Sequence, residues 1–159
     1  HSFLLEAFSK ALQQNKELVL LIVGDGALKD ELSNKIGSLG ISDNVKLLGF
    51  RKDVADLLQA ADCFVMPSIH EGLPFVLVEA QAAGLPCLIS DGVTKEAALL
   101  PTTVEARLDC PLSVWAERIA EVACAERFAD PACLLAQRGY DLQTEIKRLE
   151  EYYRCALSS

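Results

Sequence analysis

Residues 62–90, DCFVMPSIHEGLPFVLVEAQAAGLPCLIS, decide the fold of this chain. Two apolar runs, residues 63–66 and 86–89, enclose a stretch with helical patterning that Pro74 opens and Gly84 ends. Proline at the first helical position and glycine just past the last one are typical of helix limits. The stretch therefore predicts strand, loop, helix and strand, which together make one βαβ crossover.

The loop of this unit is where we expect chemistry. It lies at the carboxyl end of a strand and the amino end of a helix, where open α/β sheets bind ligands. The first N–H groups of a helix have no partner within it and together carry about half a positive charge. Because Gly72 allows close approach of the backbone, the turn Gly72–Val76 predicts a phosphate or diphosphate site.

Two carboxylates flank that turn, Glu71 in the loop and Glu79 inside the helix. Beside an anion site, acidic side chains suit sugar hydroxyls better than phosphate. An ionised carboxylate only accepts hydrogen bonds and can hold a vicinal diol with two of them. The alternative is that both are solvated acids, Glu71 on the loop and Glu79 on the wet face of the helix.

The two glutamates stand in the context P-S-x-x-E-G-x-x-x-x-x-x-E-A-x-A-x-G-x-P. This context resembles the motif of retaining glycosyltransferases of the GT-B fold, family 4. The resemblance covers residues 1–107, with V-G-D-G at 23–26, L-G-F at 48–50 and S-D-G-V-T-K-E at 90–96. It implies the C-terminal of two Rossmann-like domains, the one that binds the nucleotide-sugar donor.

The resemblance also implies a strand before the first helix, followed by a loop with an Arg and a Lys that neutralise the diphosphate. The chain starts at His1, inside what would be that loop, so we expect the strand and both cations to be missing. In the Rossmann-like order 3-2-1-4-5-6 that strand is central. We therefore expect residues 1–159 to form one α/β domain, a three-layer α/β/α half of a GT-B fold. Its mainly parallel sheet should lack the first strand, and its C-terminus should be helical.

The resemblance assigns roles to individual residues. Glu71 should act at the donor sugar, and Glu79 should accept hydrogen bonds from the ribose. The diphosphate and sugar should face Gly72, Leu73, Pro74, Phe75 and Val76, and Gly24, Phe50 and Arg51 complete the expected donor site.

Several of these residues have alternatives. Phe50 could instead close its strand as a core aromatic, and Arg51 and Lys52 could both be solvated cations that do not touch the donor. Gly24 opens a Gly-x-Gly at a strand–helix junction, which is as typical of a tight turn as of a dinucleotide site, since Lys29 replaces the third glycine. A loop at the same sheet edge holds candidates for framing the donor that also suit turns and caps, namely Asp91, Thr94, Lys95 and Glu96. We interpret His70 as a rim residue.

Composition narrows the function further. Hydrophobic residues make up 51% of the chain and aromatic residues only 6%, which favours the aliphatic core of a parallel sheet. A net charge of −8 argues against nucleic acid as a partner and against strong adhesion to anionic lipid. No apolar stretch approaches about 18 residues, the length of a membrane span. The six cysteines show no metal spacing, so we expect reduced thiols in a cytoplasmic protein and no metal, with a disulfide framework as the alternative.

Apolar periodicity predicts the remaining elements. Helices are expected near 2–14, 27–38, 54–61, 112–125, 131–138 and 142–157, and strands at 18–23, 45–48 and 103–106. We expect the strand 18–23 to be buried, and Ser2 and Asp53 to cap their helices. The helix 142–157 carries an apolar stripe that the missing N-terminal domain would cover.

The resemblance thus implies the donor-binding domain of a retaining glycosyltransferase. It would move a hexose from a UDP- or GDP-sugar to a glycan or lipid-linked acceptor, in bacterial surface or capsular polysaccharide synthesis. Family members retain configuration by same-face attack, with the leaving phosphate taking the proton, so no enzymic nucleophile is needed. The family fold usually needs no metal, so the resemblance implies no cofactor. Without the N-terminal acceptor domain we expect no transfer, and association with the inner face of the membrane through that domain stays open. The alternatives are a nucleotide-sugar epimerase or phosphorylase of the same fold and a non-catalytic binding module.

Overall fold

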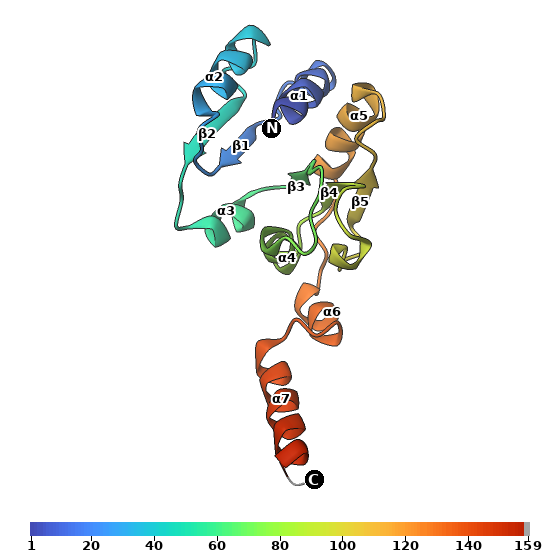
Figure 1. Ribbon diagram of the computed structural model, residues 1–159. Helices are drawn as coiled ribbons and strands as arrows, with labels where there is room; N and C mark the ends of the chain where they lie inside the picture. Colours follow the sequence, from blue (N-terminus) through green and yellow to red (C-terminus); the bar gives the residue numbers. More distant parts are fainter. Residues whose placement is uncertain (158–159) are drawn as a thin grey trace.

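The computed structural model describes residues 1–157 as a three-layer α/β/α arrangement in which helices cover both faces of parallel strands (Figure 1). The strands are β1 (Leu20–Val23), β2 (Val45–Gly49), β3 (Phe64–Met66), β4 (Cys87–Ser90) and β5 (Thr103–Ala106). The helices are α1 (Ser2–Gln14), α2 (Lys29–Ser38), α3 (Val54–Ala60), α4 (Phe75–Ala82), α5 (Leu112–Ala123), α6 (Pro131–Gln137) and α7 (Leu142–Leu157), with a 3₁₀ turn η1 (Lys95–Ala97). The expected fold class and helical C-terminus are confirmed.

The strands form two parallel groups. β1 pairs with β2, with Leu20 opposite Val45, and β3, β4 and β5 lie side by side in that order. Within residues 1–157, no strand pairs with the second edge of β1 or of β3. This arrangement is the Rossmann-like order 3-2-1-4-5-6 without its central member, as expected.

Strand β4 is buried along its whole length between two cores. Leu88 belongs to the core built mainly from α1 and α5, whereas Cys87 and Ile89 belong to the core built from α3 and α4. Successive side chains of a strand point to opposite faces, so β4 contributes to both cores. Helices α1 and α5 are joined by the edge-to-face pair of Phe3 and Trp115, whose ring centroids are 5.3 Å apart.

The expectation that the strand 18–23 is buried is wrong in part. Leu20 and Ile22 pack against the core of α1 and α5, but Leu21 and Val23 are 40% and 37% exposed. Their side chains point to the opposite face of β1, and that face is left partly open to solvent.

Helix α4 ends as the sequence predicts. Gly84 has a φ of +74°, the left-handed conformation that glycine adopts without strain, and Leu85 N–H donates to the carbonyl of Ala80 at 3.1 Å. A Cβ at position 84 would also lie 2.8 Å from the carbonyl oxygen of Phe128. At the other end the prediction is shifted by one residue, because Pro74 is the N-cap and the helix begins at Phe75.

One predicted helix cap is wrong, and the other is right in position only. His1 holds the N-cap position of α1, and the Ser2 hydroxyl inside the helix accepts a hydrogen bond from Lys35 Nζ at 2.6 Å. Asp53 does occupy the N-cap of α3, but its carboxylate makes no capping bond. Asp53 is held by Arg51 instead, which a propensity argument does not consider.

The C-terminal helices lie close to their predicted limits, and α6 and α7 extend away from the body of the domain (Figure 1). Helix α7 has no buried residue, and its predicted apolar stripe is exposed at Leu142, Ile146, Leu149 and Tyr153. The six cysteines form no disulfide within residues 1–157, so the disulfide alternative finds no support. Within residues 1–157, no helix has the length and apolar character needed to cross a bilayer.

Candidate functional site

The loop after β3 leads into α4 at the carboxyl edge of the strands. The N–H groups of Gly72, Leu73, Phe75 and Val76 donate to no other group of the described chain. Pro74, between them, has no N–H and is the N-cap of the helix. Four unpaired donors therefore gather at the positive end of the α4 dipole, which makes a favourable place for an anion.

Glu71 is fixed through its backbone and free at its side chain. Its N–H donates to the carbonyl of Gly92 at 2.8 Å, and its carbonyl accepts from the N–H of Thr94 at 3.1 Å. Its half-buried carboxylate has no hydrogen-bond or ion-pair partner among residues 1–157. The backbone is thus ordered while the carboxylate stays available to a ligand.

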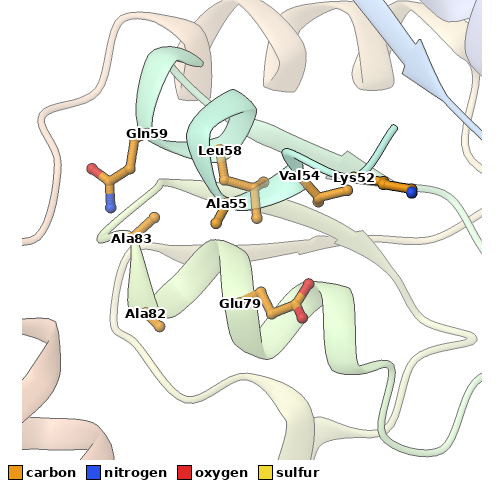
Figure 2. Close-up of a pocket in the computed structure, with 8 residues that line it drawn as sticks. All are labelled: Lys52, Val54, Ala55, Leu58, Gln59, Glu79, Ala82 and Ala83. Atoms are coloured by element: carbon orange, nitrogen blue, oxygen red, sulfur yellow. The ribbon is translucent and has the colours of Figure 1, made fainter. Parts of the chain in front are cut away.

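Glu79 lies on the exposed side of α4 rather than among the apolar residues that neighbour it in the sequence. It lines a cavity of about 430 Å³ between α3 and α4 (Figure 2). Lys52, on the segment before α3, lines the same cavity from the facing side (Figure 2). Neither side chain forms an ion pair within the described part of the chain, so both can meet a ligand. The remaining lining residues are Val54, Ala55, Leu58, Gln59, Ala82 and Ala83.

Phe50 and Arg51 follow β2 at the same sheet edge. Phe50 is 74% exposed, so the alternative of a core aromatic is wrong. Arg51 forms a forked pair with Asp53, with Nε 2.8 Å from Oδ1. This hydrogen bond raises the pKa of Arg51 and lowers the pKa of Asp53. Because Arg51 is paired with Asp53, Lys52 is the cation without an ion-pair partner at this edge, among the described residues. The two-residue spacing of Arg51 and Asp53 in the sequence could have indicated their pairing.

Gly24 is not brought together with the residues of α4. Its N–H donates to the carbonyl of Gly49 at 2.8 Å, and its φ is +133°. It lines a second cavity, of about 310 Å³, with His1, Leu28 and Leu47 among others and with no residue of α4. This geometry supports the tight-turn alternative for Gly24.

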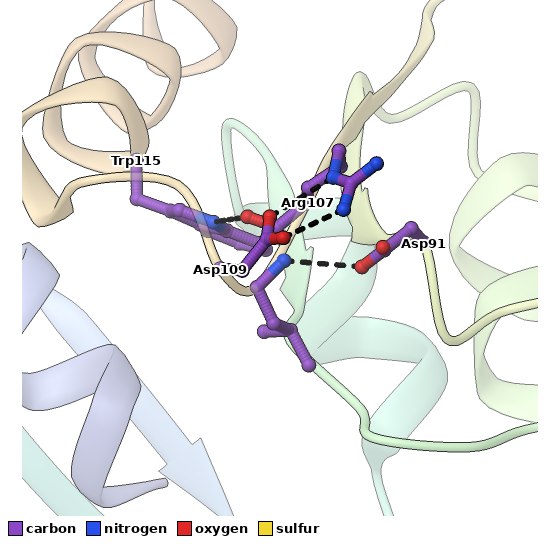
Figure 3. Close-up of polar contacts among 5 residues, drawn as sticks. Asp91, Arg107, Asp109 and Trp115 are labelled. Carbon is purple, nitrogen blue, oxygen red and sulfur yellow. Dashed lines mark hydrogen bonds and ion pairs between the residues drawn. The ribbon is translucent and has the colours of Figure 1, made fainter.

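The polar residues after β4 have different surroundings. The Asp91 carboxylate accepts from the N–H of Leu108 at 3.0 Å, next to the ion pair of Arg107 with Asp109 and the bond from Trp115 to the Arg107 carbonyl (Figure 3). Asp91 therefore links the segments that follow β4 and β5. His70, Lys95 and Glu96 are exposed. Among residues 1–157, no three His, Cys, Asp or Glu side chains come together as metal ligands would.

Comparison with known proteins identifies a family that this chain matches. Residues 1–99 match the family described as Glycosyl transferases group 1. EpsF of Bacillus subtilis (strain 168) is 40% identical over 158 residues, which cover 96% of this chain and 41% of EpsF. The UDP-Gal:alpha-D-GlcNAc-diphosphoundecaprenol alpha-1,3-galactosyltransferase of Escherichia coli is 43% identical over 74 residues, which cover 46% of this chain and 19% of that enzyme.

The structural comparison supports the same fold. The crystal structure of HepE from Anabaena in complex with UDP superimposes with a TM-score of 0.71 at 23% identity. The alignment covers 94% of this chain and 44% of HepE. The chain thus spans less than half the length of each of these three proteins.

Proposed function

The chain belongs to the family of glycosyl transferases group 1, and we propose that it forms the donor-binding domain of a retaining glycosyltransferase of the GT-B fold, family 4. The observation that carries this proposal is the group of unpaired N–H donors at the start of α4, flanked by the unpaired carboxylates of Glu71 and Glu79. Anion-binding amides next to free carboxylates suit a ligand that has both a diphosphate and sugar hydroxyls.

Each part of the ligand has a place in this proposal. The diphosphate accepts hydrogen bonds from the N–H groups of Gly72, Leu73, Phe75 and Val76, at the positive end of α4. Glu79 accepts from the ribose hydroxyls, and Glu71 accepts from the hydroxyls of the transferred sugar and orients its anomeric carbon. The base lies near Phe50 and Arg51, and the adjacent Lys52, which lines the cavity, adds a positive charge to the rim.

The proposed transfer reaction depends on where charge develops as the bond to the sugar breaks. Breaking the anomeric C–O bond leaves positive charge on the sugar and negative charge on the diphosphate. The amides at the start of α4 stabilise the departing diphosphate. The acceptor attacks from the same face, and the leaving phosphate oxygen takes the acceptor proton, so configuration is retained without an enzymic nucleophile.

The names of the relatives guide the choice of substrate. HepE is described in complex with UDP, and the E. coli relative is named for a UDP-linked sugar and a diphosphoundecaprenol acceptor. These names favour a UDP-hexose donor and a lipid-linked or glycan acceptor, in bacterial surface polysaccharide synthesis. A second domain supplies the acceptor site in the full-length protein, and transfer requires both domains at the inner face of the membrane.

Calorimetric titration of the full-length protein with UDP and with GDP tests the proposal. Glu79→Gln removes the charge of a ribose contact but keeps an acceptor oxygen, so it should weaken UDP binding about 5- to 13-fold, the difference between a charge-assisted and a neutral hydrogen bond. Glu117→Gln is the matched control, because Glu117 is also an exposed, unpaired helical glutamate but lies on α5. Equal affinities in the two variants, or no nucleotide binding in the unmodified protein, would contradict the donor-site assignment.

A further inference from the structure

The segment Gly92–Thr94, which follows β4, runs alongside the loop that carries Glu71. Glu71 and Val93 form a parallel bridge outside the regular strands. The Gly92 carbonyl accepts from the Glu71 N–H at 2.8 Å, and the Thr94 N–H donates to the Glu71 carbonyl at 3.1 Å. The backbone of Glu71 is therefore held on both sides by one short segment, although a loop residue is ordinarily free of such pairing.

Thr94 adds a contact through its side chain. Its hydroxyl Oγ1 donates to the carbonyl of Gly72 at 2.9 Å. The same residue is the N-cap of η1, but its side chain makes no capping bond there. The hydroxyl therefore serves the loop of Glu71 and not its own helical turn.

These two bonds set the direction of the anion-binding amides. A peptide unit is planar, so in its trans form the carbonyl and the N–H point in opposite directions. The Thr94 N–H fixes the carbonyl of Glu71 and hence the N–H of Gly72. The Thr94 hydroxyl fixes the carbonyl of Gly72 and hence the N–H of Leu73. One threonine thus orients two of the four unpaired donors.

Gly92 is what allows the segment to lie so close. A Cβ at position 92 would be 2.3 Å from the carbonyl oxygen of Ile69 and 2.4 Å from that of Ser68, and real Cβ atoms do not approach backbone so closely. Ser90, two residues earlier, also donates its hydroxyl to the Ser68 carbonyl. The close contact therefore runs along the loop from Ser68 to Gly72.

The segment Gly92–Thr94 is held by buried contacts with α4, while Thr94 itself is exposed. Val93 is 3% exposed and packs in the same core as Leu77 of α4. Gln81, also on α4, binds the residues that follow the segment, through Ala97, Leu99 and Leu100. The fold therefore keeps the segment in place without the Thr94 hydroxyl, which is left to set local geometry.

We propose that Thr94 is a positioning residue of the donor site, which aims the Gly72 and Leu73 amides and holds the Glu71 backbone for the nucleotide-sugar diphosphate. This role rests on the proposed function. The Thr94 hydroxyl bond should change ligand affinity much more than it changes stability, because the hydroxyl is exposed and lies on a surface loop.

The test compares Thr94→Val, which removes the hydroxyl at similar shape, with Thr94→Ser, which keeps it, in the full-length protein. Thr94→Val should weaken UDP binding about 3- to 10-fold, as expected for one neutral hydrogen bond, while Thr94→Ser should bind like the unmodified protein. Thermal midpoints of both variants should stay within about 2 °C. Thr102→Val is the matched control, because the buried Thr102 hydroxyl has no hydrogen-bond partner among the described residues.

Each outcome is decisive. Chemical shifts of the Gly72 and Leu73 amides that change in ligand-free Thr94→Val, and return in Thr94→Ser, support the positioning role. UDP binding by the unmodified protein that Thr94→Val leaves unchanged overturns the positioning role and leaves the proposed function standing. Absence of UDP binding in the unmodified protein overturns the proposed function, and the positioning role at the donor with it.

Discussion

Replacing Gln81 by leucine should destabilise the fold more than any exposed substitution, because Gln81 is a fully buried polar hub of α4. Its Oε1 accepts from the N–H of Leu99 at 2.6 Å, the N–H of Leu100 at 2.9 Å and the hydroxyl of Thr103 at 3.0 Å. Its Nε2 donates to the carbonyl of Ala97 at 2.9 Å and to that of Leu77 at 3.1 Å. All polar atoms of the side chain are thus satisfied.

The size of the loss follows from the groups left behind. Gln81→Leu leaves the buried amides of Leu99 and Leu100 unsatisfied, at about 1–3 kcal/mol each. The added apolar surface of leucine offsets about 1 kcal/mol of this. We therefore expect the free energy of unfolding to fall by about 3 kcal/mol, a large part of the roughly 5–15 kcal/mol typical of a domain. The thermal midpoint should fall by about 6–12 °C.

Urea unfolding followed by the fluorescence of Trp115, the single tryptophan of the chain, measures the change. Trp115, on α5, is fully buried against α1 and reports loss of the core. Gln137→Leu is the matched control, since Gln137 is an exposed helical glutamine on α6, and it should change stability by less than about 0.5 kcal/mol. A loss below about 1 kcal/mol in Gln81→Leu, similar to the control, would refute the reasoning.

Three further predictions concern other contacts. Arg127→Ala should lower the free energy of unfolding in urea by about 1–2 kcal/mol, because the Arg127 guanidinium donates to four carbonyls at the ends of α3 and α4. The control Arg118→Ala breaks one exposed ion pair and should lower it by less than about 0.5 kcal/mol. Equal losses in the two variants would contradict this prediction. Gly92→Ala should abolish or strongly weaken UDP binding, because the added Cβ displaces the loop of Glu71. The control Gly37→Ala has open space at its Cβ and should bind UDP normally. Normal UDP binding by Gly92→Ala would contradict this prediction. Burial raises the pKa of Cys63 to about 11 and of Cys87 to about 12, so the folded chain keeps protons that the unfolded chain loses above pH 9.0. The stability that these two thiols contribute should therefore be fully present below pH 9, and above it the free energy of unfolding should fall by up to about 1.4 kcal/mol per pH unit per thiol. Urea unfolding of Cys87→Ala at several pH values should show a smaller fall per pH unit. An unchanged fall would exclude Cys87 as a cause of the pH dependence.

Features marked by local sequence signals could be predicted. The limits of α4 follow from Pro74 and Gly84, which act on the backbone within a few residues. The alternation of apolar strands and amphipathic helices likewise predicts the α/β class. The loop of Glu71 could be placed at the sheet edge for the same reason, since position in a βαβ unit fixes it.

Features that depend on distant residues could not be predicted. Leu21 and Val23 have the composition of a buried strand, but their exposure depends on what lies over the other face of β1. Gln81 looks like a solvent-facing residue of a short helix, yet all its partners but Leu77 lie 16 to 22 residues further along the chain. Gly92 resembles an ordinary turn glycine, and only the folded loop shows the backbone that excludes a side chain there.

The most direct test of the central claim is a two-dimensional ¹H–¹⁵N NMR titration of the protein with UDP. The account predicts that the largest amide shifts fall on Gly72, Leu73, Phe75 and Val76, because the diphosphate accepts from these N–H groups. Shifts centred instead on the second cavity, at Gly24 and Gly26, or shifts spread evenly over the surface, would contradict it.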